Sequence, residues 1–179
     1  MSEDTNVLLD VENLHTSFFT DNGEVKAVNG ISFKLEKGKT LGIVGESGSG
    51  KSVTAYSIMQ ILAETGRVTE GKVLFKGDNI LDYSESEMQK FRGEKISIIF
   101  QDPMTSLNPV FTVGYQLEEA ILLHTNKTKA EAKARAIEML TLVGVNEPES
   151  RVKQYPHELS GGMRQRVMIA MALCCEPDV

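Results

Sequence analysis

The chain has 179 residues, of which 41% are hydrophobic and 25% charged, and its formal net charge is −6 at pH 7. This composition suits a globular protein with one good core, or one core and a small packed lobe. The acidic balance disfavours nucleic acid as the main partner. No apolar run approaches the ~18 residues that span a bilayer, residues 1–10 lack the regions of a signal peptide, and two cysteines cannot form a secretory disulfide framework. We therefore expect a cytosolic protein that docks to an embedded partner if it works at a membrane.

The first hundred residues have the pattern of short strands. One run, Thr40–Val44, is apolar and stops at Gly45, as expected for a strand that is buried on both faces of a sheet. The other expected strands are rich in apolar, β-favouring residues, and they occupy 7–14, 25–35, 71–77 and 95–100.

Helical patterns follow the first strands and dominate after Gln101. Two capping boxes, Ser84 with Glu87 and Thr128 with Glu131, mark the starts of two helices. An α/β core that carries a helical insertion at about 102–158 follows from this order. The expected helices share apolar residues at helical spacing or a cap, and they occupy 51–62, 85–91, 113–124, 129–143 and 161–175.

The segment "GESGSGKS", Gly45–Ser52, matches the phosphate-binding pattern G-x-x-x-x-G-K-[ST]. Its glycines let backbone N–H groups point inward at a helix N-terminus, Lys51 reaches the β- and γ-phosphates, and Ser52 takes one Mg²⁺ position. The alternative is a flexible Gly/Ser loop that binds no ligand. The expected buried strand before the loop and the helix after it favour nucleoside triphosphate binding. The expected nucleotide contacts are Gly45, Glu46, Ser47, Gly48, Ser49, Gly50, Lys51, Ser52 and Val53.

A second helix start, in "LSGGMRQR", also has the chemistry of an anion site. Ser160 suits an N-cap, and Gly161 and Gly162 lie in the first turn. This segment lies about 110 residues from the first loop, more than one nucleotide site needs within one subunit. We expect it to serve a nucleotide held by a partner in a head-to-tail dimer. An ordinary Ser-capped helix remains the alternative.

The segments "GESGSGKS", "FQDP" and "LSGGMRQR" together resemble the nucleotide-binding subunit of an ATP-binding cassette (ABC) transporter, from about Val7 to the end. "FQDPMTSLNP" with "YPHELSGGMRQRVMIAMAL" resembles, more narrowly, the ATPase subunits of oligopeptide and dipeptide importers, a group that also includes nickel importers. Met163 resembles the D-type subunit, where the wider family carries Gln.

This resemblance implies an α/β fold, a P-loop NTPase core of the ABC ATPase type. The core carries an antiparallel β subdomain and a helical subdomain. The implied division is 1–101 for the nucleotide-binding core, 102–158 for the helical subdomain and 159–179 for a signature helix that returns to the core.

Residue roles also follow from the resemblance. Gln101 matches the family's glutamine that contacts Mg²⁺ and the attacking water, so it joins Lys51 as a catalytic residue, and Ser52 and Gln101 are the expected Mg²⁺ ligands. Phe18 lies about where the family stacks an aromatic ring on adenine, although an apolar anchor in the sheet is an equal alternative. The signature residues expected to contact the partner's ATP are Leu159, Ser160, Gly161, Gly162 and Met163.

The implied cofactors are ATP and Mg²⁺, and the implied place is the cytoplasmic face of the cell membrane. The implied partners are a second ATPase subunit, expected to be a different chain, in a head-to-tail dimer, two transmembrane permease subunits docking near Asp102–His124, and indirectly an extracellular peptide-binding protein. No nucleic acid is implied.

The family's Mg²⁺-binding aspartate and catalytic glutamate follow a strand that begins just after "EPDV", so we expect this chain to be C-terminally incomplete and poorly active. Two alternatives stay open. One is a nucleotide-binding module without turnover, and the other is a soluble ABC ATPase of DNA repair or translation.

Cys174 and Cys175 are adjacent near the end of the last expected helix. Adjacent side chains on a helix point about 100° apart, which is poor geometry for joint ligation of a metal. We expect them to be part of the helix core.

Overall fold

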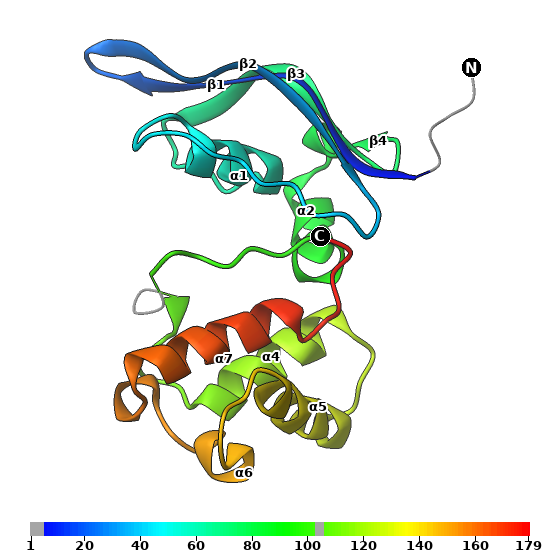
Figure 1. The fold of residues 1–179 in the computed structure, drawn as a ribbon, viewed down its shortest axis with the longest axis vertical. Coiled ribbons are helices and arrows are strands. Elements are labelled where there is room, and N and C mark those ends of the chain that lie inside the picture. Colours follow the sequence, from blue (N-terminus) through cyan, green and yellow to red (C-terminus); the bar gives the residue numbers. More distant parts are fainter. Residues whose placement is uncertain (1–5, 103–105) are drawn as a thin grey trace. The chain divides into compact units, whose positions relative to one another are not determined.

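The computed structural model describes residues 6–102 and 106–179. The chain divides into two compact units, Met1–Met88 and Gln89–Val179 (Figure 1). The division falls within helix α2, Glu85–Glu94, whose backbone leaves the helical region at Arg92 and Gly93. The three-part division at residues 101 and 158 stays a prediction.

The first unit contains an antiparallel sheet with strand order β2-β1-β3-β4. The two long strands β1 and β2 form a hairpin, and β3 pairs with the other edge of β1 (Figure 1). Side chains of β1 and β3 that are buried on one face, such as Val11, Leu14 and Val73, form its core. The strands are β1 Val7–Thr20, β2 Gly23–Glu36, β3 Gly66–Phe75 and β4 Asp78–Asn79.

Helix α1, Lys51–Met59, packs beside this sheet. A buried hydrogen bond of 2.8 Å between the hydroxyls of Thr16 and Ser57 ties β1 to it. The helix ends three residues earlier than the sequence predicts, because Gln60 adopts a left-handed conformation with φ of 51°. A short 3-10 helix, Ile80–Asp82, follows β4.

Thr40–Val44 was predicted to be a buried strand, and that prediction is wrong for this structure. No strand of the described residues pairs with it, and Val44 is 92% exposed. A strand buried on both faces is stable only between two hydrogen-bonded neighbours, and the four described strands form a separate antiparallel sheet.

Residues 95–100 are likewise not a regular strand, and Ile99 and Phe100 are exposed. Their first residues nevertheless show the start of a parallel pairing. Val179 N–H donates to Lys95 O at 3.2 Å, and Ser97 N–H donates to Val179 O at 2.9 Å. The two hydrogen bonds of Val179 thus reach Lys95 and Ser97, the residues on either side of Ile96, and this pattern is typical of parallel strands.

The second unit is mainly helical, and its caps follow the sequence. Thr128 and Glu131 form the predicted capping box, with Glu131 Oε2 accepting from Thr128 N–H at 2.7 Å. Ser84 and Glu87 form the other predicted box at the start of α2. The remaining helices are α4 Val113–His124, α5 Lys129–Leu142, α6 Pro148–Arg151, the 3-10 helix Pro156–Glu158 and α7 Gly161–Leu173.

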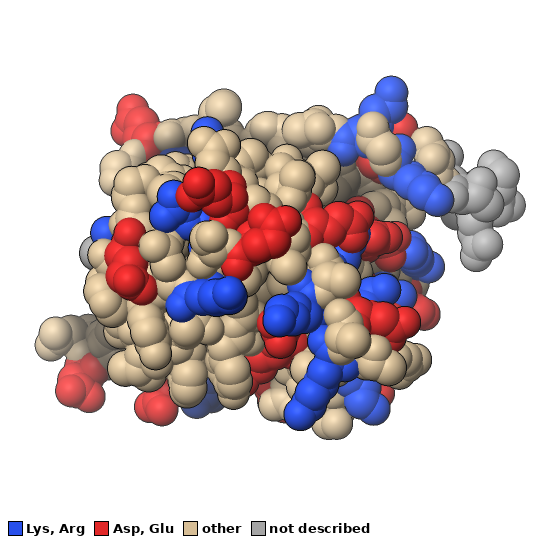
Figure 2. Space-filling view, turned by 90° about the horizontal axis from the view of Figure 1, so that it is seen from below, with Lys and Arg blue, Asp and Glu red and all other residues tan. Residues whose placement is uncertain are grey.

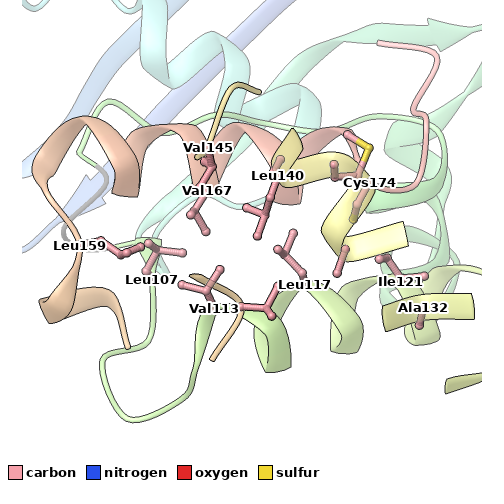
Figure 3. Close-up of a cluster of buried hydrophobic side chains, with 14 residues drawn as sticks. Leu107, Val113, Leu117, Ile121, Ala132, Leu140, Val145, Leu159, Val167 and Cys174 are labelled. Carbon is pink, nitrogen blue, oxygen red and sulfur yellow. The ribbon is translucent and has the colours of Figure 1, made fainter. Parts of the chain in front are cut away.

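The core of this unit lies between α4, α5 and α7. Leu117 and Ile121 from α4, Leu140 from α5 and Val167 from α7 point toward one another and are fully buried (Figure 3). Leu159, which precedes the N-cap residue of α7, is buried in the same cluster. The N-terminus of α7 is therefore anchored to a packed core.

On the face shown in Figure 2, acidic and basic side chains are interspersed among uncharged residues and do not gather by sign. Within the part of the chain that the structure describes, no helix is long and apolar enough to cross a membrane.

Candidate nucleotide-binding site

The loop at Gly45–Ser52 wraps into the N-terminus of α1, as its sequence predicts. Gly50 precedes the first helical residue, Lys51, and has φ of 88° and ψ of 2°. A Cβ at Gly50 would lie 2.5 Å from Ala27 O of β2, so the position requires glycine for both its conformation and its space. The loop therefore lies close to β2, and it leads into the first N–H groups of α1, which have no acceptor within the helix.

Lys51 folds back over the loop. Its ammonium donates to Gly45 O at 2.7 Å, to Glu46 O at 2.6 Å and to Ser49 Oγ at 3.3 Å. A cation held by neutral carbonyl oxygens at a helix N-terminus is well placed to exchange these partners for phosphate oxygens, which carry charge and form stronger hydrogen bonds.

The first turn of α1 has one face exposed to solvent and one face packed against the rest of the unit. Ser52 is exposed in the first turn, and Val53 is half-buried. Thr54 is buried, and its hydroxyl donates to Gly50 O at 3.0 Å. The Ser52 hydroxyl is therefore the side-chain oxygen of this turn that faces solvent beside Lys51.

Two adjacent aromatic residues end β1 in the same unit. The ring of Phe18 lies against Gly66 of β3, because a Cβ there would meet Phe18 Cε1 at 2.8 Å. Phe19 is exposed and carries the Arg67 guanidinium 5.9 Å above its ring centroid. The half-buried position of Phe18 fits the apolar-anchor alternative as well as adenine stacking, and its stacking role stays a prediction.

The signature segment is an open helix start. Ser160 caps α7 as predicted, and its Oγ accepts from Met163 N–H at 3.3 Å. Gly161 and Gly162 are exposed, and a Cβ at either would meet nothing within 4 Å. Thirteen aligned peptides thus direct the positive end of a helix toward solvent.

Met163 turns away from that open end and packs against the hydrophobic cluster of the second unit. Its side chain is therefore not needed for anion binding, which explains why an apolar residue is tolerated after the two glycines. Arg164 donates from Nε to Leu159 O at 3.0 Å and braces the turn before the cap.

Gln101 is exposed and lies in the second unit with the signature segment, whereas the phosphate loop and Phe18 lie in the first. Part of the predicted docking segment, residues 103–105, falls outside the described residues. The roles of these site residues in catalysis and metal binding stay predictions.

The sequence model of one protein family, described as "ABC transporter", matches residues 28–179. The chain belongs to the ABC transporter family. It is 56% identical over 173 residues to the dipeptide transport ATP-binding protein DppD of Bacillus subtilis (strain 168), covering 96% of this chain and 52% of that protein. It is 54% identical over 177 residues to the oligopeptide transport ATP-binding protein OppD of Escherichia coli (strain K12), covering 99% and 52%. The chain thus spans about half the length of the curated relatives it matches.

Solved ABC structures show the same fold. The dimeric structure of MJ0796, a bacterial ABC transporter cassette, matches with a TM-score of 0.83 and 27% identity over 95% of this chain and 71% of that chain. A post-hydrolysis state of MJ0796 bound to ADP and Pi matches with a TM-score of 0.84, also at 27% identity and with the same coverage. These matches confirm the predicted fold class, the P-loop NTPase core of an ABC ATPase with antiparallel and helical parts.

Some features of the site had no signal in the sequence. The Ser49 hydroxyl that holds Lys51, and the Ala27 carbonyl that excludes a side chain at Gly50, follow from packing rather than from the motif. A regular motif predicts which residues meet the phosphates, but not which neighbours support them.

Proposed function

We propose that this chain is the ATP-binding part of an ATPase subunit that energises import of oligopeptides or dipeptides across the cytoplasmic membrane. The observation that carries the proposal is the Lys51 ammonium folded over the loop at the start of α1. The transport of peptides rests on the relatives, two of which are named for dipeptide and oligopeptide transport.

In this proposal the chain binds ATP through its backbone N–H groups and Lys51. Ser52 and Gln101 are the proposed protein ligands of Mg²⁺, which would neutralise phosphate charge. The exposed hydroxyl of Ser52, one residue from Lys51, would suit a Mg²⁺ ion, because hard cations prefer oxygen ligands. Gln101 is proposed to orient the attacking water.

The open N-terminus of α7 supports a second role in a dimer. We propose that Leu159–Met163 contact the ATP of a partner subunit in a head-to-tail arrangement, with Ser160 and the Gly162 N–H as the phosphate contacts. One relative of known structure, MJ0796, is described as a dimer. Mixing this chain with a candidate partner ATPase, and comparing it with this chain alone, distinguishes a dimer of two different chains from a dimer of two copies.

Docking of two transmembrane permease subunits is proposed for the described part of Asp102–His124. Val110, Phe111 and Tyr115 are exposed there, and the rings of Phe111 and Tyr115 stack with centroids 4.7 Å apart. An exposed aromatic pair is a common anchor for a protein partner. The subunit would then lie at the cytoplasmic face of the membrane, and an extracellular peptide-binding protein would take part indirectly.

Uptake of a labelled dipeptide by cells that produce the Lys51→Ala protein tests the proposal. Uptake should fall to background, whereas Lys39→Ala, a lysine outside the loop, should leave it unchanged. Unchanged uptake by Lys51→Ala cells would refute the transport role. ATP binding without hydrolysis in the complete subunit complex would instead favour the alternative of a module without turnover. The other alternative, an ATPase of DNA repair or translation, is disfavoured by the relatives' names.

A further inference from the structure

The end of α7 brings two thiols together against the expectation from helical spacing. Cys174 follows the last helical residue, and its Sγ lies 3.6 Å from Cys175 Sγ. Cys174 is buried in the hydrophobic cluster of the second unit (Figure 3), and Cys175 is half-buried. The prediction that Cys174 is core is confirmed, but the two sulfurs do not diverge.

Both cysteines line a cavity of about 390 Å³ in the second unit. Residues 125–127, Arg135 of α5 and the acidic Glu176 complete its wall. Arg135 is fixed in place, because it donates to Glu138 at 3.0 Å and to Glu176 at 2.7 Å. The cavity is therefore a formed space with two sulfurs and a held guanidinium in its wall.

The electrostatics favour a reactive thiol at Cys175. The pKa of the Cys175 thiol is lowered, chiefly by the hydrogen bond with Cys174. Burial raises this pKa, the Arg135 charge lowers it, and the Glu94 charge raises it. The same hydrogen bond, together with burial, raises the pKa of Cys174. Cys175 is thus the first thiol to act as a nucleophile, with the Cys174 sulfur beside it as the second.

The spacing disfavours a disulfide and favours a bridging atom. A disulfide needs sulfurs about 2.0 Å apart and Cα atoms usually 4.4–6.8 Å apart, whereas adjacent Cα atoms are about 3.8 Å apart. One atom with bonds of roughly 2.3 Å to each sulfur would span the 3.6 Å gap with an angle of roughly 100° at its centre. That angle suits a pyramidal or tetrahedral centre and excludes a linear one.

A tetrahedral metal such as Zn²⁺ needs further protein ligands. Among residues 6–102 and 106–179, no group of three or more His, Cys, Asp or Glu residues is placed to hold a metal ion. A pyramidal centre that brings its own third substituent needs only two sulfurs. Trivalent arsenic that carries one organic group has this property, and the cavity provides space for the group.

We propose that Cys174 and Cys175 form a dithiol site for a monosubstituted trivalent arsenical. With phenylarsine oxide, two S–H bonds break and two As–S bonds form, while the arsenic-bound oxygen leaves as water with both protons. Arsenic stays trivalent, so no oxidant or reductant takes part. Binding removes both thiol protons, and with them the contacts of Cys174 Sγ with Met171 O at 3.1 Å and of Cys175 Sγ with Ala120 O at 3.7 Å.

Titration of the folded 179-residue chain with phenylarsine oxide, followed by intact-mass spectrometry, tests the proposal. One equivalent should bind, resist an excess of a monothiol and leave on addition of a dithiol. Cys175→Ser should weaken binding by about 10²- to 10⁴-fold, the gain expected when two weak attachments act together. Cys174→Ala should do the same, and thermal unfolding establishes that each variant is folded.

Two results would overturn the proposal. One is binding by Cys175→Ser that equals the original chain. The other is binding by the chain in guanidinium chloride but not by the folded chain, which would mean that burial of Cys174 closes the site. Neither result depends on ATP binding, so both are independent of the proposed transport function.

Discussion

Gly50 is the residue at which the phosphate loop is most constrained. We expect Gly50→Ala to abolish ATP binding. We also expect it to lower the free energy of unfolding by at least about 1–2 kcal/mol, the cost of a left-handed conformation for an L-residue. The added Cβ also meets Ala27 O at 2.5 Å, so the loop must move. Equilibrium urea unfolding and ATP titration measure the two effects.

Gly38→Ala is the matched control. Gly38 has φ of 73°, yet a Cβ there would meet nothing within 4 Å. This variant carries the conformational strain without the clash, so it should lose stability and keep nucleotide binding. Equal ATP binding by both variants would show that the contact with β2 does not shape the loop.

Single residues were predictable where a motif names them. Lys51 and Ser160 occupy the positions that the sequence predicts, at a helix start and at an N-cap. Their supporting contacts, such as the Ser49 hydroxyl on Lys51, depend on how the loop closes and have no sequence signature.

At the scale of the element, Ser160 fixes where α7 begins. We expect Ser160→Ala to destabilise the chain by about 1 kcal/mol, because Met163 N–H loses its acceptor. Ser160→Thr retains a capping hydroxyl and should be close to the original in thermal unfolding. If the alanine and threonine variants unfold at the same temperature, the cap does not support the helix.

The start of α5 should respond to acid. The hydroxyl of Thr128 and then its backbone N–H donate to Glu131 and lower the pKa of that carboxyl below its ordinary value of 4.5. A lowered folded-state pKa means that the carboxylate stabilises the fold above the unfolded value. This contribution is lost as the pH falls through the folded value.

The free energy of unfolding, measured from neutral pH down to about pH 3, tests this role of Glu131. The original chain should lose more stability over this range than Glu131→Gln, which retains a capping side chain but has no carboxyl to titrate. Identical acid profiles for the two chains would exclude a role for this carboxylate.

Elements were predictable where their signals are local. Capping boxes at Ser84 and Thr128 and the helix Val113–His124 depend on residues a few positions apart, and the structure has them. The prediction of a buried strand at Thr40–Val44 is wrong, because such a strand depends on neighbours distant in the sequence. No described strand pairs with this segment.

At the scale of the whole molecule, this unpaired run leaves apolar side chains in water. Leu41, Ile43 and Val44 are exposed within four residues, a contiguous group rather than scattered side chains. We expect the chain to bind a hydrophobic fluorescent dye and Val44→Ser to reduce that fluorescence. Val25→Ser, at an exposed valine on the hairpin, is the matched control and should change it little. Equal decreases in both variants would place the dye elsewhere.

The central claim is that the loop at Gly45–Ser52 binds ATP through Lys51, and calorimetric titration with Mg·ATP tests it most directly. Hydrogen bonds to charged groups contribute about 1.5–3 kcal/mol each, so Lys51→Ala should raise Kd by about 10- to 150-fold. Lys39→Ala, outside the loop, should leave Kd unchanged. An unchanged Kd in Lys51→Ala would contradict the account.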